Sequence, residues 1–463
     1  MRSVEAQVAE LRGIAERAAA AGVRAGAEAA EALVSDGIEL SVKVRMGKPE
    51  LVQEAGARAL GLRVFRDHRA AVTYTSDLRP DALERFVAET VELAKLSEPD
   101  ELNELPADDQ FAMTVPELEL FDEKVLAIDA KRALDEALRA EAASRAFSSK
   151  ITNSEGASFG RVSGATAFAI AGRGRQGFAA GYASSYCSLS VEPIADDTDG
   201  KKRNGSHWTA ARFVASLEPS EEVGREAARR TIAKLGSEKI ATGAMPVVFD
   251  PEAGRDLLRL FASVVSGGAI YRRSSYLIDR ESTEVASKLC HIVDDPLLRR
   301  GPGSRPFDGD GLAARRNVVV DAGILHTYLL DTYSARKLGR ASNGCAGRGV
   351  GGAPHVTTSN FILQPGTTPK AEVLRGLDRA LYVTDLMGFG FNATTGDFSR
   401  GAAGFLIEGG QLGRPVGEIT VSANFDALWR AVDCIGDDLD RRSSTASPTF
   451  RVAQMMIAGH SGH

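Results

Sequence analysis

Residues 246–268, PVVFDPEAGRDLLRLFASVVSGG, decide how the second half of this chain folds. An apolar run at 247–249 is typical of a buried strand, and Asp250 with Pro251 interrupts it. Apolar residues then recur at helical spacing, which predicts a strand, a turn and a helix. The residues on the predicted apolar face are Leu257, Leu258, Leu260, Phe261, Val264 and Val265.

The predicted helix can be tested for its ability to hold a catalytic metal. Zinc hydrolysis needs about three imidazole, carboxylate or thiolate ligands, an open coordination position and a carboxylate near the bound water. Arg259 carries a guanidinium, which does not coordinate a cation, while Leu260 and Val264 are aliphatic. We therefore expect an amphipathic helix packed on a sheet, with no metal site on it.

Composition and charge are those of an ordinary soluble globular protein. The chain has 463 residues, of which 43% are hydrophobic and 25% charged, enough for two or three cores. A net charge of −6 with dispersed Lys and Arg offers no basic surface for a nucleic acid. The opening residues lack the apolar region of a signal peptide and no later apolar run has membrane length, so we expect no membrane association and a cytoplasmic location.

Periodicity predicts an α+β fold with two parts. Residues 1–236 form helix-plus-sheet units, with a possible subdivision in the Pro- and acid-rich stretch 97–117, and residues 237–463 form a largely antiparallel, β-rich domain. In the first part the predicted helices are 4–22, 80–95, 129–146 and 221–235. The predicted strands there are 38–46, 60–65, 70–74, 165–171 and 177–191. In the second part, hairpins are expected at 318–330 and 405–416.

Two short motifs match known patterns without their supporting context. Residues 172–177 have the spacing of a dinucleotide-binding loop, but the next residues have strand character, which favours a hairpin turn. Residues 334–337 match Ser-x-x-Lys, but the companion motifs of acyl-enzymes are missing. We expect a loop-to-helix junction there, with Arg336 and Lys337 pointing to solvent.

Several separated blocks resemble the TldD/PmbA family nearly from end to end, most closely its metal-free branch, PmbA/TldE. In the catalytic branch, TldD, a His-Glu-x-x-x-His motif directly follows the residues that correspond to Leu257 and Leu258. Here residues 259–264 are Arg-Leu-Phe-Ala-Ser-Val. The family's cysteine ligand should fall near 443–447, which are Ser-Ser-Thr-Ala-Ser. The blocks that carry the resemblance are 151–159, 266–274, 332–339, 384–388 and 395–404.

The resemblance implies a non-catalytic partner subunit of a TldD–TldE-type heterodimeric metalloprotease. The TldD-type subunit would hold the zinc, and the substrates would be unfolded peptides, in leader-peptide removal and small-protein turnover. This chain would carry no cofactor and would be inactive alone. Two alternatives remain open: a homodimeric peptide-binding or scaffold protein without proteolysis, and a stand-alone peptidase with an unrecognised metal or nucleophile.

The segment 389–404, FGFNATTGDFSRGAAG, is the candidate peptide-binding surface. One interpretation is a tight strand–turn–strand corner, where Gly396 supplies a positive φ and Asp397 caps the turn. The other is a recognition loop, because small residues let a second backbone approach and polar side chains bond peptide groups or a carboxylate. The candidate binding residues are Asn392, Thr394, Thr395, Ser399 and Arg400.

Overall fold

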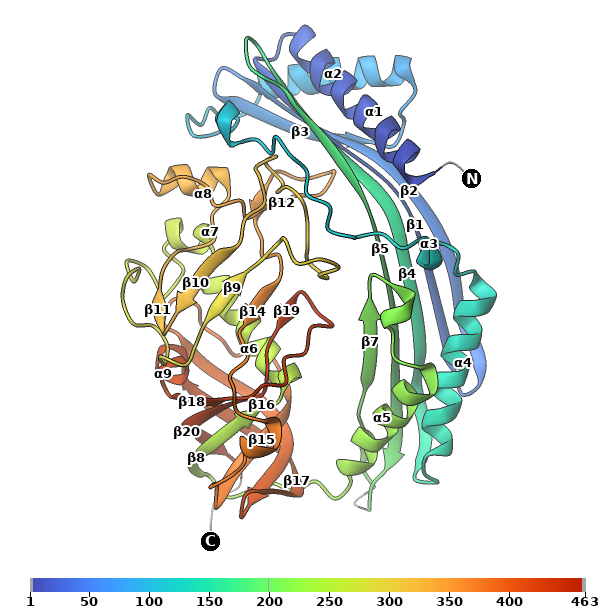
Figure 1. Ribbon diagram of the computed structural model, residues 1–463, viewed down its shortest axis with the longest axis vertical. Coiled ribbons are helices and arrows are strands. Elements are labelled where there is room, and N and C mark those ends of the chain that lie inside the picture. Colours follow the sequence, from blue (N-terminus) through green and yellow to red (C-terminus); the bar gives the residue numbers. More distant parts are fainter. Residues whose placement is uncertain (1–2, 199, 460–463) are drawn as a thin grey trace.

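The structure is a computed structural model that describes residues 3–198 and 200–459. A long, curved antiparallel sheet dominates the first half of the chain (Figure 1). Its strands follow the order β3-β2-β1-β4-β5-β6, and β7 also pairs with β5. Their bounds are β1 Ala29–Arg45, β2 Lys48–Arg66, β3 Arg69–Thr75, β4 Ile151–Gly172, β5 Phe178–Asp196, β6 Lys202–Asn204 and β7 His207–Ala211.

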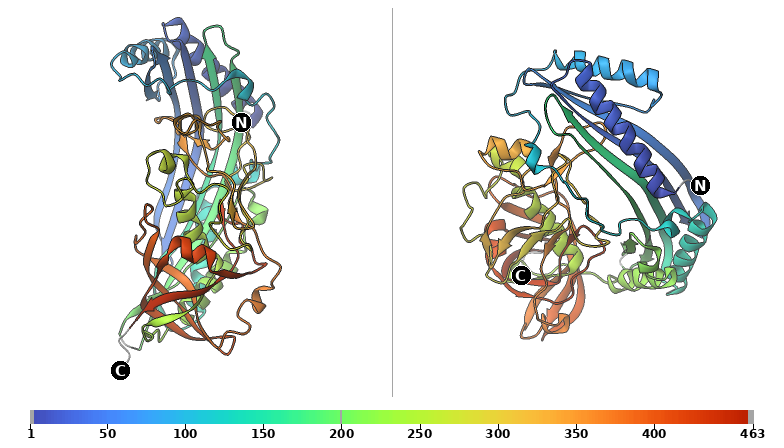
Figure 2. Two further views of the ribbon diagram at one scale, coloured as in Figure 1. Left: turned by 90° about the vertical axis from the view of Figure 1, so that its left-hand side faces the viewer. Right: turned by 45° about the horizontal axis from the view of Figure 1, so that its top comes forward.

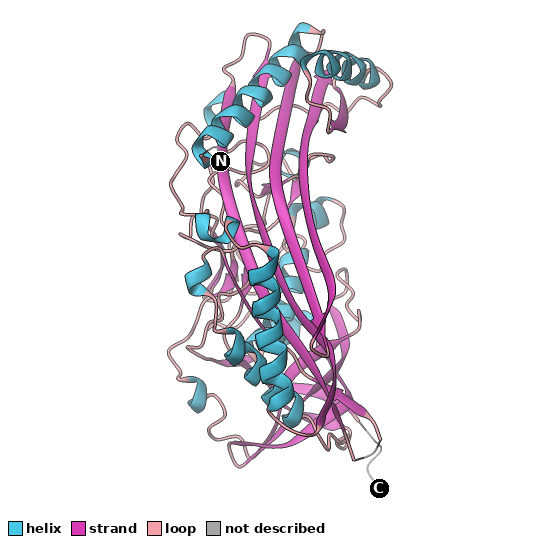
Figure 3. Ribbon diagram, turned by 90° about the vertical axis from the view of Figure 1, so that its right-hand side faces the viewer, coloured by secondary structure: helices cyan, strands magenta, loops and turns pink. Residues whose placement is uncertain are grey.

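Four helices cover one face of this sheet (Figure 3). They are α1 (Val4–Arg24), α2 (Pro80–Ala94), α4 (Ala130–Ala146) and α5 (Ser220–Ala233), and short α3 (Glu123–Leu126) precedes α4. Alternate residues of each strand point to opposite faces, so Ala30 and Val42 pack beneath the helices while Ala29 and Leu33 face the other way. That other, concave face is turned toward the C-terminal domain (Figure 2).

Helix α1 shows why the helices lie close to the sheet. Ser3 caps it by accepting a hydrogen bond from the amide of Ala6, and Leu11 and Ala18 lie on its buried face. A Cβ on Gly22 would lie 2.8 Å from the Cβ of Ala30. We predicted Gly22 as the end of this helix, but the helix runs on to Arg24. Gly22 is required by close approach to β1, not by a change of backbone conformation.

The C-terminal domain is built on a six-stranded sheet that closes on itself. Its order is β17-β16-β15-β8-β20-β18, and β17 also pairs with β20. Helices α6 (Pro251–Val264) and α9 (Phe425–Arg430) contribute to its aromatic core, where Phe261 contacts Trp429, and Trp429 stacks on Phe450. The strands are β8 Gly243–Phe249, β15 Arg379–Met387, β16 Asp397–Glu408, β17 Gln411–Asn424, β18 Val432–Ile435 and β20 Phe450–Ala458.

A second, smaller sheet in this domain has the order β11-β10-β9-β14-β19. Its strands are β9 Ile292–Asp294, β10 Asn317–Asp321, β11 Ile324–Leu325, β14 Phe361–Leu363 and β19 Thr445–Ala446. Helices α7 (Gly267–Tyr271) and α8 (Thr332–Lys337) and the pair β12 (Ala346–Gly347) and β13 (His355–Val356) complete the domain. The buried ion pair between Arg348 and Glu31 of β1, 2.8 Å between Nη1 and Oε2, joins this domain to the long sheet.

The predicted α+β class is confirmed, and so are both C-terminal hairpins and the hairpin turn at 172–177. One prediction about a side chain is wrong. Arg336 does not point to solvent; its guanidinium donates to the carbonyl oxygens of Leu102, Glu104 and Leu105, because the 97–117 connection packs against α8. Among the described helices, none is both long and apolar enough to cross a membrane.

Candidate functional site

Helix α6 is the element on which the sequence places the altered metal motif. Asp250 caps it, with a carboxylate oxygen 2.7 Å from the amide nitrogen of Ala253, and Pro251 occupies its first position. Val264 is fully buried in the domain core, and Leu260 is partly buried against the same core. Arg259 lies on the outer side of the helix, with 52% of its side chain exposed.

The segment 443–447 lies beside this helix. The Arg259 Nη2 is 3.5 Å from the Ser443 Oγ, and its Nη1 is 3.3 Å from an oxygen of Asp256. One turn earlier, a Cβ on Gly254 would lie 2.7 Å from the Ser447 Oγ, so only glycine allows this approach. The structure therefore brings together the two regions where the family resemblance locates metal ligands.

The side chains at this junction do not fit a zinc ion. The pKa of Arg259 is lowered by burial and by Arg255, but a guanidinium remains charged and offers no lone pair. Leu260 and Val264 have no donor atom, and serine hydroxyls are not the thiolate, imidazole or carboxylate ligands that zinc takes. Within residues 3–198 and 200–459, no cluster of three or more His, Cys, Asp and Glu side chains has the arrangement of a metal site.

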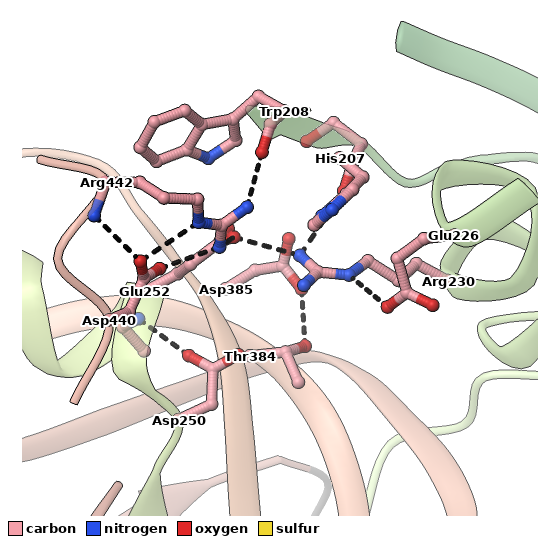
Figure 4. A network of polar contacts seen from close by, with 12 residues as sticks. His207, Trp208, Glu226, Arg230, Asp250, Glu252, Thr384, Asp385, Asp440 and Arg442 are labelled. Atoms are coloured by element: carbon pink, nitrogen blue, oxygen red, sulfur yellow. Dashed lines mark hydrogen bonds and ion pairs between the residues drawn. The ribbon is translucent and has the colours of Figure 1, made fainter. Parts of the chain in front are cut away.

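A charged network at the N-terminal end of α6 joins the two halves of the chain (Figure 4). Glu252, in the first turn of α6, accepts from Arg230 of α5 at 3.0 Å and from Arg442 at 3.4 Å. Arg230 also donates to Glu226 at 2.9 Å, and Arg442 makes two bonds to Asp440 at 2.9 and 2.7 Å. Glu252 thus connects α5 to the segment that leads into 443–447.

Trp208 of β7 is the aromatic centre of this network. The guanidinium of Arg442 lies 4.7 Å from the centroid of the Trp208 ring and donates to its carbonyl oxygen, and Arg255 of α6 lies over the same ring at 5.4 Å. The neighbouring residue, His207, is 2.9 Å from Glu218. The stacking fixes Arg442, and with it the position of Ser443.

A cavity of about 440 Å³ opens beside this network, between α5 and β15. Lys234, which caps the C-terminal end of α5, donates to Asp385 of β15 at 2.9 Å, and the Thr384 hydroxyl donates to the other oxygen of Asp385 at 2.6 Å. Asp250 also lines the cavity, and burial raises its pKa to about 7 although the bond from Ala253 opposes this. Most of these charges are paired with one another, so the arrangement connects the two domains. These residues do not form a nucleophile–base pair.

Sequence analysis did not predict this network. Its members come from α5, β7, the start of α6, β15 and the 440–442 segment, and no spacing along the chain relates them. Glu252, the acidic residue after Pro251, could have suggested an ion pair. An acidic residue is common in the first turn of any helix, however, so it does not indicate a network.

The predicted peptide-binding residues of 389–404 are divided by the structure. Asn392 and Ser399 line a shallow hollow of about 710 Å³. Thr394 and Thr395 lie at the exposed tip, where their amides donate to the Asn392 side chain at 3.0 and 3.3 Å. Arg400 follows Ser399 in β16 and therefore points to the opposite face of the strand.

The corner interpretation of this segment is correct in its geometry. Gly396 has a φ of +79°, which favours glycine. Asn392 does most of the capping, while Asp397 accepts from the hydroxyl of Thr395 at 2.7 Å. The hollow beside the corner also contains an exposed aromatic, Phe389, which is 97% exposed. The segment is therefore both a tight corner and an open, partly apolar surface.

Comparisons with known proteins agree with this architecture. Family models match residues 30–94 (PmbA/TldA metallopeptidase domain 1), 123–235 (central domain) and 242–459 (C-terminal domain). The chain is 34% identical to "Metalloprotease PmbA" of Escherichia coli O157:H7 over 93% of this chain and 92% of that protein.

Solved structures share the fold. A proposed modulator of DNA gyrase from Bacteroides thetaiotaomicron is 25% identical, with a TM-score of 0.87 over 97% of this chain and 99% of its own. TldE from Thermococcus kodakarensis is 17% identical, with a TM-score of 0.83 over 96% and 99%, which shows a common fold alone. On the three family-model matches and the 34% identity, the chain belongs to the PmbA/TldD metallopeptidase family.

Proposed function

We propose that this chain is the non-catalytic partner subunit of a TldD–TldE-type heterodimeric metalloprotease. The observation that carries the proposal is the junction of α6 with 443–447, where Arg259, Leu260, Val264 and Ser443 stand at or beside the family's ligand positions. Among the described residues these positions carry no usual zinc ligand, yet the chain has the fold of its relatives around the junction. Such preservation is expected of a subunit that supports hydrolysis by another chain.

In this proposal the TldD-type subunit supplies zinc, general base and hydrolysis, and this chain contributes surface that guides an unfolded peptide. The hollow that contains Asn392, Ser399 and Phe389 supports this role, because it combines exposed apolar area with side chains that bond peptide groups. Substrates would be leader peptides of modified peptides and small unfolded proteins. The complex would act in the cytoplasm.

Co-expression with a TldD-type protein of the same organism tests the proposal. The two chains should co-purify, and an unfolded peptide should be cleaved by the mixture in a zinc-dependent manner but not by this chain alone. A matched mixture whose TldD-type subunit has lost the His-Glu-x-x-x-His histidines should be inactive. Cleavage by this chain alone, after removal of any partner, would instead favour a stand-alone peptidase. A homodimer that binds peptides but ignores the partner would favour a scaffold protein.

A further inference from the structure

The long sheet has an open edge at one end of β5. The outer edge of this strand is occupied at three places: β7 pairs with residues 187–191, β6 pairs with 194–196, and the amide of Ser185 donates to the carbonyl of Leu120 at 2.9 Å. Within the described chain, no segment pairs with this edge between Phe178 and Ser184. The edge continues there without a neighbouring strand.

The backbone polar groups on this stretch can be assigned from the Ser185 bond. In an antiparallel ladder, the N–H and C=O of one residue point to the same side, and consecutive residues alternate. Since the Ser185 amide points outward and the pairing with β4 has no bulge from 178 to 191, Ala179, Gly181 and Ala183 also direct their N–H and C=O outward. None of these six groups has a hydrogen-bond partner among the described residues.

A groove of about 790 Å³ follows this edge. Val4 and Val8 of α1 form one wall, and the connection at 115–121, with Pro306, forms the other. Figure 3 shows the N-terminal end of α1 at this margin of the sheet. The residues of this edge are small, and a Cβ on Gly181 would lie only 3.0 Å from Val8. The groove is open because Gly181 has no side chain to fill it.

The edge also lacks the features by which proteins usually block pairing. Natural sheets protect edges with charged residues, proline or bulges. Residues 178–191, FAAGYASSYCSLSV, contain no charged residue and no proline, and their pairing with β4 has no bulge. An edge without these features is expected either to be covered by another segment or to pair with a bound strand.

We propose that this groove binds an extended peptide segment as an additional strand on β5. Only another extended backbone presents N–H and C=O groups at the spacing of Ala179, Gly181 and Ala183, and β7 and Leu120 already pair with the same edge in this way. Five residues of β5 span about 16 Å, so the bound segment would be about five residues long. The inference rests on the proposed function in one respect: the extended segment is an unfolded peptide substrate.

Binding to the isolated chain tests this inference without any cleavage. The probe is a fluorescent, N-acetylated and amidated ten-residue peptide of alternating valine and serine, followed by fluorescence polarisation. Two further versions carry N-methyl groups on all valine amides or on all serine amides. Because amides alternate sides along a strand, one methylated version should lose at least tenfold in affinity and the other should stay within about twofold. Equal loss, or no loss, in both versions overturns strand addition.

A pair of variants on α1 locates the binding. Val4→Glu places a charge in the groove wall, whereas Ala6→Glu places one on the same turn, exposed and outside the groove. An acidic residue is favourable at a helix N-terminus, so neither should unfold α1. Val4→Glu should weaken peptide binding at least fivefold and Ala6→Glu less than twofold; equal effects overturn the location.

A proline variant tests the edge itself. Ala183→Pro removes one outward N–H at a position where an edge strand tolerates proline, and it should weaken peptide binding about tenfold with an unchanged circular dichroism spectrum. If it instead dissociates a dimer of the isolated chain and leaves peptide binding intact, the occupant is a second copy and the proposal is wrong. If the isolated chain does not bind the peptide but the reconstituted complex still cleaves it, the groove is not a peptide-binding site. The proposed function would be unaffected by that result.

Discussion

The Nη2 of Arg259 lies 3.5 Å from the Oγ of Ser443, although 184 residues separate them along the chain. A contact of this length is a weak hydrogen bond at best. It nevertheless shows that α6 and the segment before the last strand meet, and these are the two regions where the family resemblance locates metal ligands.

We expect the purified chain to bind no stoichiometric zinc. Guanidinium, aliphatic and hydroxyl groups meet at this junction, and none is a zinc ligand of the usual kind. Elemental analysis of tag-free protein, after incubation with zinc and gel filtration, should find well below one zinc per chain. A value near one would contradict the assignment of Arg259, Leu260 and Val264 as altered ligand positions.

The double substitution Arg259→His with Val264→His should not create a protease. Val264 is fully buried, so an imidazole there lacks a hydrogen-bond partner and costs about 1–3 kcal/mol of folding stability. The catalytic carboxylate and a third ligand would still be missing. Zinc-dependent cleavage of an unfolded peptide by this variant alone would show that the junction is better organised than we infer. Arg259→His alone, at a half-exposed position, is the control for folding.

Arg442 should be the most sensitive member of the charged network. It is paired with the carboxylates of Asp440, Glu252 and Glu218, so Arg442→Ala leaves three carboxylates without this partner. It also contacts the carbonyl and ring of Trp208. We expect the free energy of unfolding to fall by about 1–3 kcal/mol. Differential scanning calorimetry measures the change, with the exposed neighbour Arg441→Ala as the matched control.

Lysine should not replace Arg442. Lysine keeps the charge but lacks the planar fork that bonds Asp440 at two points and stacks on Trp208. Arg442→Lys should therefore lower the thermal midpoint nearly as much as alanine does. A lysine variant as stable as the wild type would mean that the network acts by charge alone.

The sequence could predict the local part of this structure and little of the long-range part. The strand, break and helix around Asp250 follow from adjacent residues, and each is present. The role of Gly22 depends on the distance of α1 from β1, which local periodicity does not contain. The bonds of Arg442 depend on a tryptophan 234 residues away, and no pattern along the chain encodes such a pair.

Asp250 should make stability depend on pH. Burial, together with the charges of Glu252 and Asp385, raises its pKa to about 7, although the Ala253 amide and Arg230 act in the opposite direction. Because the folded state holds this proton more tightly than the unfolded state, stability falls as the pH rises from about 4 to about 7. Asp250→Asn keeps a capping oxygen without the charge.

The Asn variant should therefore gain thermal midpoint relative to the wild type as the pH rises. The two proteins should differ least near pH 4, and the variant should be more stable near pH 8, with about 2–4 °C for each kcal/mol in a domain of this size. Comparing the two proteins at each pH cancels the titration of all other groups. A difference that does not change with pH, or that favours the wild type at pH 8, contradicts the burial argument.

The last prediction concerns adjacent residues of β16 that lie on opposite faces. Ser399 is exposed in the hollow, so Ser399→Glu should leave the thermal midpoint unchanged and slow peptide cleavage by the assembled complex severalfold if the hollow guides the substrate. Arg400 is half-buried on the other face, and Arg400→Ala should then leave cleavage per complex near the wild-type rate. The opposite pattern, with Arg400→Ala slow and Ser399→Glu normal, would place the peptide on the inner face. Gly396→Val is the control for a broken corner, because a β-branched residue at a φ of +79° should lower stability and activity together.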